Sequence, residues 1–160
     1  MTYKRKRRHA VKLPCYRVAD IKPLGHNHEI EAYLRSCGVW AQARDKLKEI
    51  YYYVQDESNH RKSFFAAGWK NELGHWQVAA PHFTGCLAHP ALTIIPGTDD
   101  QAWLFETCFD YLRQPGITNT GAHIIILNNP GLIQAGLAKA RGFSQTRTFF
   151  NNPLPQTENH

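Results

Sequence analysis

The run Ile124-Ile125-Ile126-Leu127 limits most strongly how this chain can fold. Four consecutive apolar residues without polar alternation are typical of a strand that is buried on both faces, with structure packed above and below it. We expect further strands over 102–105 and 146–150, and helices over 107–113 and 130–141 between the three strands. This alternation of strands and helices predicts a small α/β parallel sheet in the second half of the chain.

The first half of the chain has a different pattern. Apolar and β-branched runs over 50–54, 63–69 and 75–80, separated by turn residues at 56–59 and 71–74, predict an antiparallel meander, and 92–95 adds a short strand. A helix is expected from the N-cap Asn27 to a C-terminal Gly38, and a second over 41–48. The predicted fold class is an α+β N-terminal subdomain followed by the α/β sheet. The predicted segments are a basic arm (1–12), the α+β subdomain (13–98), the α/β subdomain (99–154) and a tail (155–160).

The positive charge of the chain is concentrated at its start. The formal net charge is +6, and the first twelve residues supply all of it, because beyond them basic and acidic side chains are equal in number. A uniformly basic surface is therefore excluded. The arm can neutralise the phosphates of DNA or RNA, although nuclear-localisation signals have a similar composition. Its candidate nucleic-acid-binding residues are Lys4, Arg5, Lys6, Arg7, Arg8 and Lys12, and Lys70 is a further candidate in the body of the chain.

No apolar run approaches the roughly 18 residues of a membrane span, and no apolar segment follows the basic arm as in a secretory signal. The four cysteines are scattered, which is typical of reduced thiols and predicts a cytoplasmic protein without a membrane partner.

Glu106 and Asp110 form the sharpest candidate site. Glu106 follows the expected strand 102–105, at the strand end where open α/β sheets place their ligand sites, and Asp110 lies one helical turn further on. Two carboxylates so placed can share Mg²⁺, which prefers oxygen ligands. In the alternative interpretation Glu106 interacts with the helix N-terminus and Asp110 is a solvated surface acid.

Two other groups of residues have simpler explanations. The intervals between Cys15, His26, His28 and Cys37 are too irregular for a structural zinc site, so we expect no zinc. The aromatic residues of the meander can stack on bases, as in single-strand binders, but we favour core and cross-strand packing, with one or two rings exposed.

The motif Glu106-x-x-x-Asp110 after an apolar strand resembles the first motif of the Toprim domain of bacterial primases and topoisomerases. The resemblance extends over roughly 18–152 to mobile-element DNA primases of the primase/Toprim type. The upstream blocks that carry it are Pro23-Leu24, Ala32-Tyr33-Leu34, Ala43-Arg44, Glu49-Ile50-Tyr51-Tyr52, Phe65 to Asn71, Gly74-His75-Trp76, Pro81 to Cys86 and Leu92-Thr93. It implies a primase-like core in which Glu106 acts at the catalytic centre and Asp110 shapes it, with Mg²⁺ as cofactor and DNA replication as the process.

The sequence departs from this family where the metal should bind. The third strand should end in an Asp-x-Asp motif, but Asn151 and Pro153 stand at those two positions, which leaves Glu106, Asp110 and Asn151 as weak metal ligands. Basic positions beyond the meander are neutral here, as Ala79, Ala80 and Thr84. The expected function is a catalytically impaired, primase-related protein that binds nucleic acid or a replication protein. The alternatives are an active Mg²⁺-dependent primase that uses Glu106 and Asp110, a protein-interaction subunit, and a decayed gene fragment.

Overall fold

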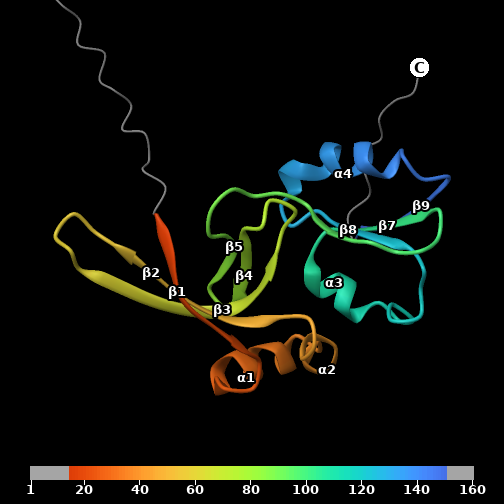
Figure 1. The fold of residues 1–160 in the computed structure, drawn as a ribbon. Coiled ribbons are helices and arrows are strands. Elements are labelled where there is room, and N and C mark those ends of the chain that lie inside the picture. Colours follow the sequence, from red (N-terminus) through yellow and green to blue (C-terminus); the bar gives the residue numbers. More distant parts are fainter. Residues whose placement is uncertain (1–14, 151–160) are drawn as a thin grey trace, which may run out of the picture.

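The computed structural model describes residues 15–150, which form two β-sheets and four α-helices (Figure 1). Sheet A belongs to the first half of the chain and sheet B to the second. The described residues are thus a mixed α and β structure in which strands predominate. No helix among them is long and apolar enough to cross a membrane.

Sheet A is antiparallel, with its strands in sequence order. They are β1 (Tyr16–Pro23), β2 (Lys48–Gln55), β3 (Arg61–Lys70), β4 (Trp76–Ala80) and β5 (Phe83–Cys86). The sheet curves so strongly that Tyr16 on one edge strand and Phe83 on the other lie with ring centroids 5.9 Å apart. Its inner face encloses a core of Ile50, Tyr52, Ala66, Val78 and Leu87.

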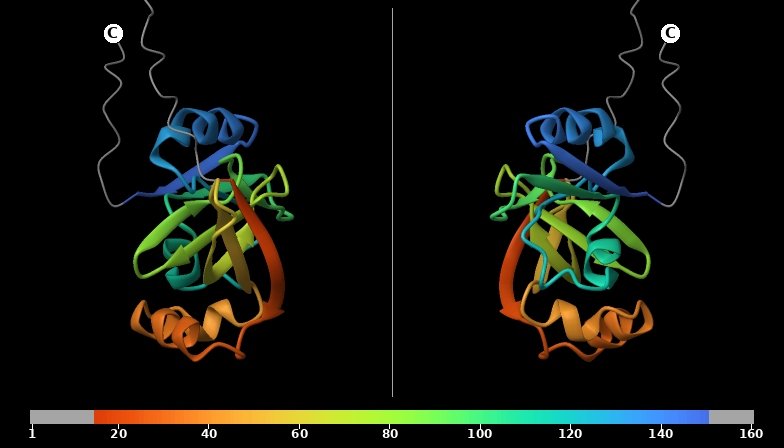
Figure 2. Two further views of the ribbon diagram at one scale, coloured as in Figure 1. Left: turned by 90° about the vertical axis from the view of Figure 1, so that its left-hand side faces the viewer. Right: turned by 90° about the vertical axis from the view of Figure 1, so that its right-hand side faces the viewer.

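Two helices connect β1 to β2 and lie together at one end of the molecule, below sheet A in Figure 2. In α1 (His28–Ser36), the side chain of Asn27 accepts hydrogen bonds from the N–H groups of Glu29 and Ile30, which confirms the predicted N-cap. Gly38 follows with φ +73°, as a glycine after a helix end commonly does. The second helix, α2 (Trp40–Ala43), is shorter than predicted.

Sheet B contains the predicted alternation of strands and helices. Its order is β6-β8-β7-β9, and β7 pairs in parallel with both β8 and β9. Its elements are β6 (Thr93–Ile95), β7 (Gln101–Phe105), α3 (Cys108–Arg113), β8 (His123–Ile126), the 3₁₀ turn η1 (Pro130–Leu132), α4 (Ile133–Ala140) and β9 (Gln145–Phe149). The sheet is mixed rather than wholly parallel, because β6 joins β8 in the antiparallel sense.

The two sheets share one hydrophobic core. Leu34 of α1, Ala67 of β3, Phe105 of β7 and Leu112 of α3 belong to the same buried cluster, so both halves of the chain contribute to it. A separate cluster, which includes Leu104, Ile125 and Ala140, fills the opposite face of sheet B beneath α4. The shared core places α3 and the carboxyl ends of β7 and β8 against sheet A.

Candidate functional site

Glu106 stands at the carboxyl end of β7, directly before α3. Its main-chain carbonyl accepts a hydrogen bond from the N–H of Asn128 at 3.1 Å, which joins the ends of β7 and β8. The residue is half-buried. Within residues 15–150 its carboxylate has no hydrogen-bond or ion-pair partner.

Asp110, in contrast, is engaged within its own helix. Thr107 caps α3 by accepting a hydrogen bond from the Asp110 N–H at 3.1 Å. The Asp110 carboxylate pairs with Arg113 at 3.3 Å, and the Nε of Arg113 donates to the carbonyl of Cys37 at 2.9 Å. The guanidinium group therefore competes with any cation for Asp110.

The described residues do not supply a metal-binding cluster. Between residues 15 and 150 no three His, Cys, Asp or Glu side chains gather in a way that could hold a metal ion, and this includes Glu106 and Asp110. The third predicted ligand, Asn151, lies outside the described residues. Phe149 of β9 is in register with Phe105 of β7, so the chain leaves β9 at the same sheet edge where Glu106 stands.

Asn128 connects sheet B to sheet A at this edge. It adopts φ +66°, a left-handed conformation that asparagine tolerates better than most residues. Its side-chain oxygen accepts a hydrogen bond from the indole N–H of Trp69 at 3.0 Å, and its amide group donates to the carbonyl of Ala91 and to the hydroxyl of Thr93. These contacts fix Trp69 beside the end of β8.

A cleft of about 180 Å³ opens between sheet A and the start of α3. Three aromatic rings form much of its wall: the ring of Phe109 lies 5.9 Å from that of Tyr33 and 6.3 Å from that of Trp69. Arg113 adds a cationic group, and Asn128 adds its amide. A cavity of roughly 150 Å³ can hold a benzene-sized ring, so the cleft has room for one flat ring.

Trp69 also borders a second cleft, of about 330 Å³, beside β6. Lys46 and Lys70 contribute cationic groups to this cleft. The ammonium group of Lys70, the one predicted basic contact within the described residues, lies 5.3 Å from the ring centre of Trp76. The other predicted basic contacts, Lys4 to Arg8 and Lys12, lie outside the described residues.

Cys108 lies at the start of α3, between the two clefts. The thiol is buried, and this burial raises its pKa well above the ordinary value, against a smaller opposing effect of the Lys46 charge. It is therefore a packed, protonated thiol rather than a nucleophile.

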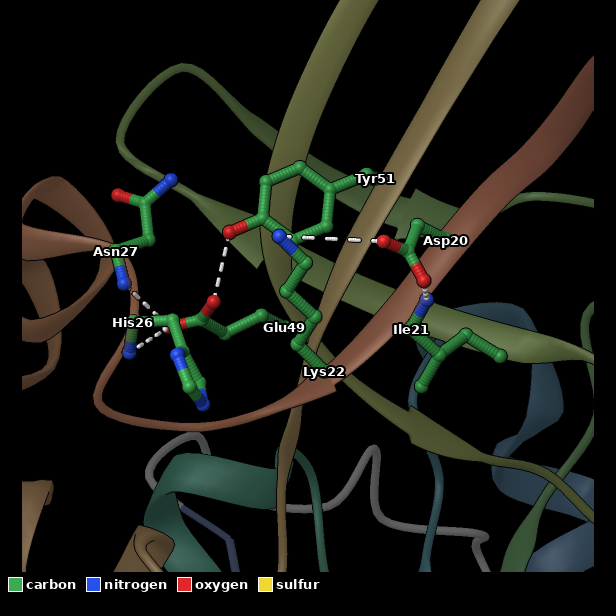
Figure 3. Close-up of polar contacts among 7 residues, drawn as sticks. All are labelled: Asp20, Ile21, Lys22, His26, Asn27, Glu49 and Tyr51. Atoms are coloured by element: carbon green, nitrogen blue, oxygen red, sulfur yellow. Dashed lines mark hydrogen bonds and ion pairs between the residues drawn. The ribbon is translucent and has the colours of Figure 1, made fainter.

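Glu49 is a buried carboxylate that no sequence motif marks as a site residue (Figure 3). It is fully buried on β2, and one oxygen accepts hydrogen bonds from the N–H groups of His26 and Asn27 at 3.0 and 2.7 Å. The other oxygen accepts from the hydroxyl of Tyr51 at 2.7 Å. Every contact is internal, so Glu49 holds the loop before α1 against sheet A and is not aimed at a ligand.

A family model described as a domain of unknown function (DUF8464) matches residues 18–88. The matched stretch contains β1 apart from its first two residues, α1, α2 and β2 to β5. It ends before sheet B, so it includes neither Glu106 nor Asp110. No curated protein and no solved structure matches the chain.

Proposed function

We propose that this chain is a primase-related, Toprim-like protein that binds nucleic acid but does not carry out nucleotidyl transfer. The resemblance of its motifs to mobile-element primases gives the class. The observation that carries the binding role is the cleft at the carboxyl edge of sheet B, where Tyr33, Trp69 and Phe109 surround a space for one ring beside Arg113. Aromatic side chains and arginine are the groups on which unpaired bases stack.

The proposed loss of catalysis follows from the charges near Glu106. Metal-assisted phosphoryl transfer requires cations held by several carboxylates, which stabilise the charge that develops on the transferred group. Here Asp110 is paired with Arg113, and the chain continues from β9 into Asn151 and Pro153 instead of two aspartates. Glu106 alone provides too little negative charge for this chemistry.

A primer-synthesis assay tests this proposal. The full chain is incubated with a single-stranded template and nucleotides in the presence of Mg²⁺ or Mn²⁺, and we expect no extended product. The Glu106→Gln variant serves as the control. Template-directed product that the wild type makes and Glu106→Gln does not make would overturn the proposed loss of catalysis.

The Glu106 carboxylate, which has no partner among residues 15–150, favours one second candidate, an active Mg²⁺-dependent primase whose missing ligands lie outside the described residues or on a partner. In that case Mg²⁺ raises the melting temperature of the wild type, and Glu106→Gln abolishes the shift. A replication protein that co-purifies, without any nucleic-acid binding, would instead support a protein-interaction subunit.

The basic arm makes a separate contribution to binding. Replacing Lys4, Arg5, Lys6, Arg7, Arg8 and Lys12 by glutamine in the full chain removes all the net charge of +6. We expect weaker DNA binding and a smaller dependence of the affinity on salt, because fewer counterions are released. Unchanged salt dependence would show that the arm does not contact phosphates.

A further inference from the structure

The three consecutive tyrosines of β2 point to different faces of sheet A. Tyr52 is 3% exposed in the inner core, and its ring stacks on Phe64. Side chains alternate along a strand, so Tyr51 and Tyr53 project from the opposite face, where both are half-buried. Further along β3 the same face carries Ala67, which belongs to the core shared with sheet B. Phe65 of β3 is in register with Tyr51 and lies on the same face, with ring centroids 6.3 Å apart. We call Tyr51, Tyr53 and Phe65 the aromatic platform.

Cationic side chains surround this platform. The ammonium group of Lys22 lies 5.1 Å from the ring centre of Tyr51, and the guanidinium group of Arg61 lies 4.3 Å from that of Tyr53. Arg17 of β1 is in register with Tyr53 and so shares its face. Asp20, which pairs with Lys22 at 3.9 Å, provides the neighbouring negative charge on β1.

The ring of Tyr51 is held in place before any ligand arrives. Its hydroxyl donates a hydrogen bond to the buried Glu49 carboxylate at 2.7 Å, and Lys22 lies close to its half-buried ring (Figure 3). An ordered ring loses little conformational freedom when a ligand stacks on it, so this arrangement favours binding.

We propose that the aromatic platform binds single-stranded nucleic acid, with bases stacked on Tyr51 and Tyr53 and with Lys22 and Arg61 on the phosphates. The cations now covering the rings do not prevent this. An exposed cation–π contact contributes about 0.5–1 kcal/mol, whereas a base stacked on an aromatic side chain contributes about 1–3 kcal/mol. Stacking therefore displaces the cations, which are then free to contact phosphate.

Phe65 packs against the same buried core as Tyr33, Trp69 and Phe109 and lines a small pocket with Tyr33, so it adjoins the cleft on which the proposed function rests. Tyr51 and Tyr53, which the tests replace, line neither the cleft nor that pocket. On β3, Phe65 is four residues from Trp69, which is about 13 Å along an extended strand, and Tyr53 is opposite Ser63, further still. The two surfaces can therefore be tested independently in the full chain.

The first test measures fluorescence anisotropy with labelled dT12, rU12 and a 12-base-pair duplex. For the double variant Tyr51→Leu/Tyr53→Leu we expect about a tenfold or greater loss of affinity for the single strands, and little change for the duplex. The relative loss for dT12 and rU12 shows whether the platform prefers DNA or RNA. Phe83→Leu is the matched control, because Phe83 is a 36% exposed ring elsewhere on sheet A. Unchanged single-strand affinity in the double variant, or an equal loss in Phe83→Leu, would overturn the proposal.

The second test uses charge. Lys22→Gln/Arg61→Gln removes two cations from the platform, and Lys48→Gln/Lys62→Gln removes two from the other face of the same sheet. Only the first pair is expected to weaken binding and reduce its salt dependence. The double tyrosine variant can fail to fold, because Tyr51 donates a hydrogen bond to the buried Glu49. In that case Lys22→Gln/Arg61→Gln and the single variant Tyr53→Leu test the platform proposal.

A cleft variant separates the two proposals. If Arg113→Gln abolishes binding and the platform variants do not change it, the platform proposal is wrong and the proposed function stands. If the platform variants alone weaken binding, the platform is the binding surface and the cleft is not. Absence of any oligonucleotide binding would overturn both.

Discussion

At the scale of single residues, Glu49 is expected to be the most sensitive position of sheet A. Glu49→Ala leaves the N–H groups of His26 and Asn27 and the hydroxyl of Tyr51 without their acceptor. A buried donor without a partner costs about 1–3 kcal/mol, so we expect a loss of at least 3 kcal/mol in the free energy of unfolding, measured by urea denaturation. Tyr51→Phe removes only one of the three bonds, with an expected loss of about 1 kcal/mol. Equal effects of the two variants would contradict this role of Glu49.

The raised pKa of Tyr52 predicts that the free energy of unfolding falls at alkaline pH. Burial, aided by the nearby Tyr16, raises the pKa of Tyr52 from 10.0 to about 12. The pKa of Tyr52 is higher in the folded than in the unfolded protein. The contribution of its protonated hydroxyl to the free energy of unfolding is therefore fully present below about pH 10 and is lost as the pH rises towards 12. The loss is expected to be about 2 kcal/mol. Urea denaturation from pH 9 to 12 measures it, and Tyr52→Phe, which keeps the ring stacked on Phe64, should lose less stability over this range than the wild type.

At the scale of elements, two glycines allow close contact between segments. Gly68 lets β3 lie close to β2, and Gly97 lets the segment after β6 lie close to the loop before β8. A Cβ at Gly68 of β3 would meet the side chain of Ile50, and overpacking of this kind costs about 1–3 kcal/mol. A Cβ at Gly97 would meet the backbone carbonyls of Gly121 and Ala122, which cannot rotate away, so Gly97→Ala should destabilise more than Gly68→Ala. Thermal unfolding compares the two variants. Gly142→Ala, where the nearest atom lies at 3.6 Å, is the control with little expected change.

The elements that could be predicted are those whose signals are local. Asn27 and Gly38 mark the ends of α1, and Thr107 marks the start of α3, because caps depend on neighbouring residues in the chain. Strands β1 and β5 were not predicted. Most residues of β1 are exposed, and it is an edge strand that pairs only with β2, so its sequence has little apolar alternation. The 3₁₀ turn at 130–132 was predicted as part of α4, since Pro130 is also a good first residue of an α-helix.

At the scale of the whole molecule, the shared core predicts that both halves unfold together. Leu34 of α1 and Leu112 of α3 are almost fully buried in the same cluster. Leu34→Ala and Leu112→Ala should each lower the free energy of unfolding by about 2–5 kcal/mol. Each variant should shift the midpoint of one common transition. Circular dichroism and tryptophan fluorescence, followed together in urea, test this. Two separate transitions, with each variant shifting only one of them, would show that sheets A and B are independent domains.

The sequence by itself determined the caps, the strands of the meander, the alternation of strands and helices, and the position of Glu106 after a buried strand. These features depend on short periodic patterns and on the covalent order of the chain. Only the tertiary structure decided that β6 joins sheet B, that Asp110 is paired with Arg113, and that Tyr33, Trp69 and Phe109 meet in one cleft. These arrangements follow from strand pairing and packing between residues far apart in the chain, for which no local pattern exists.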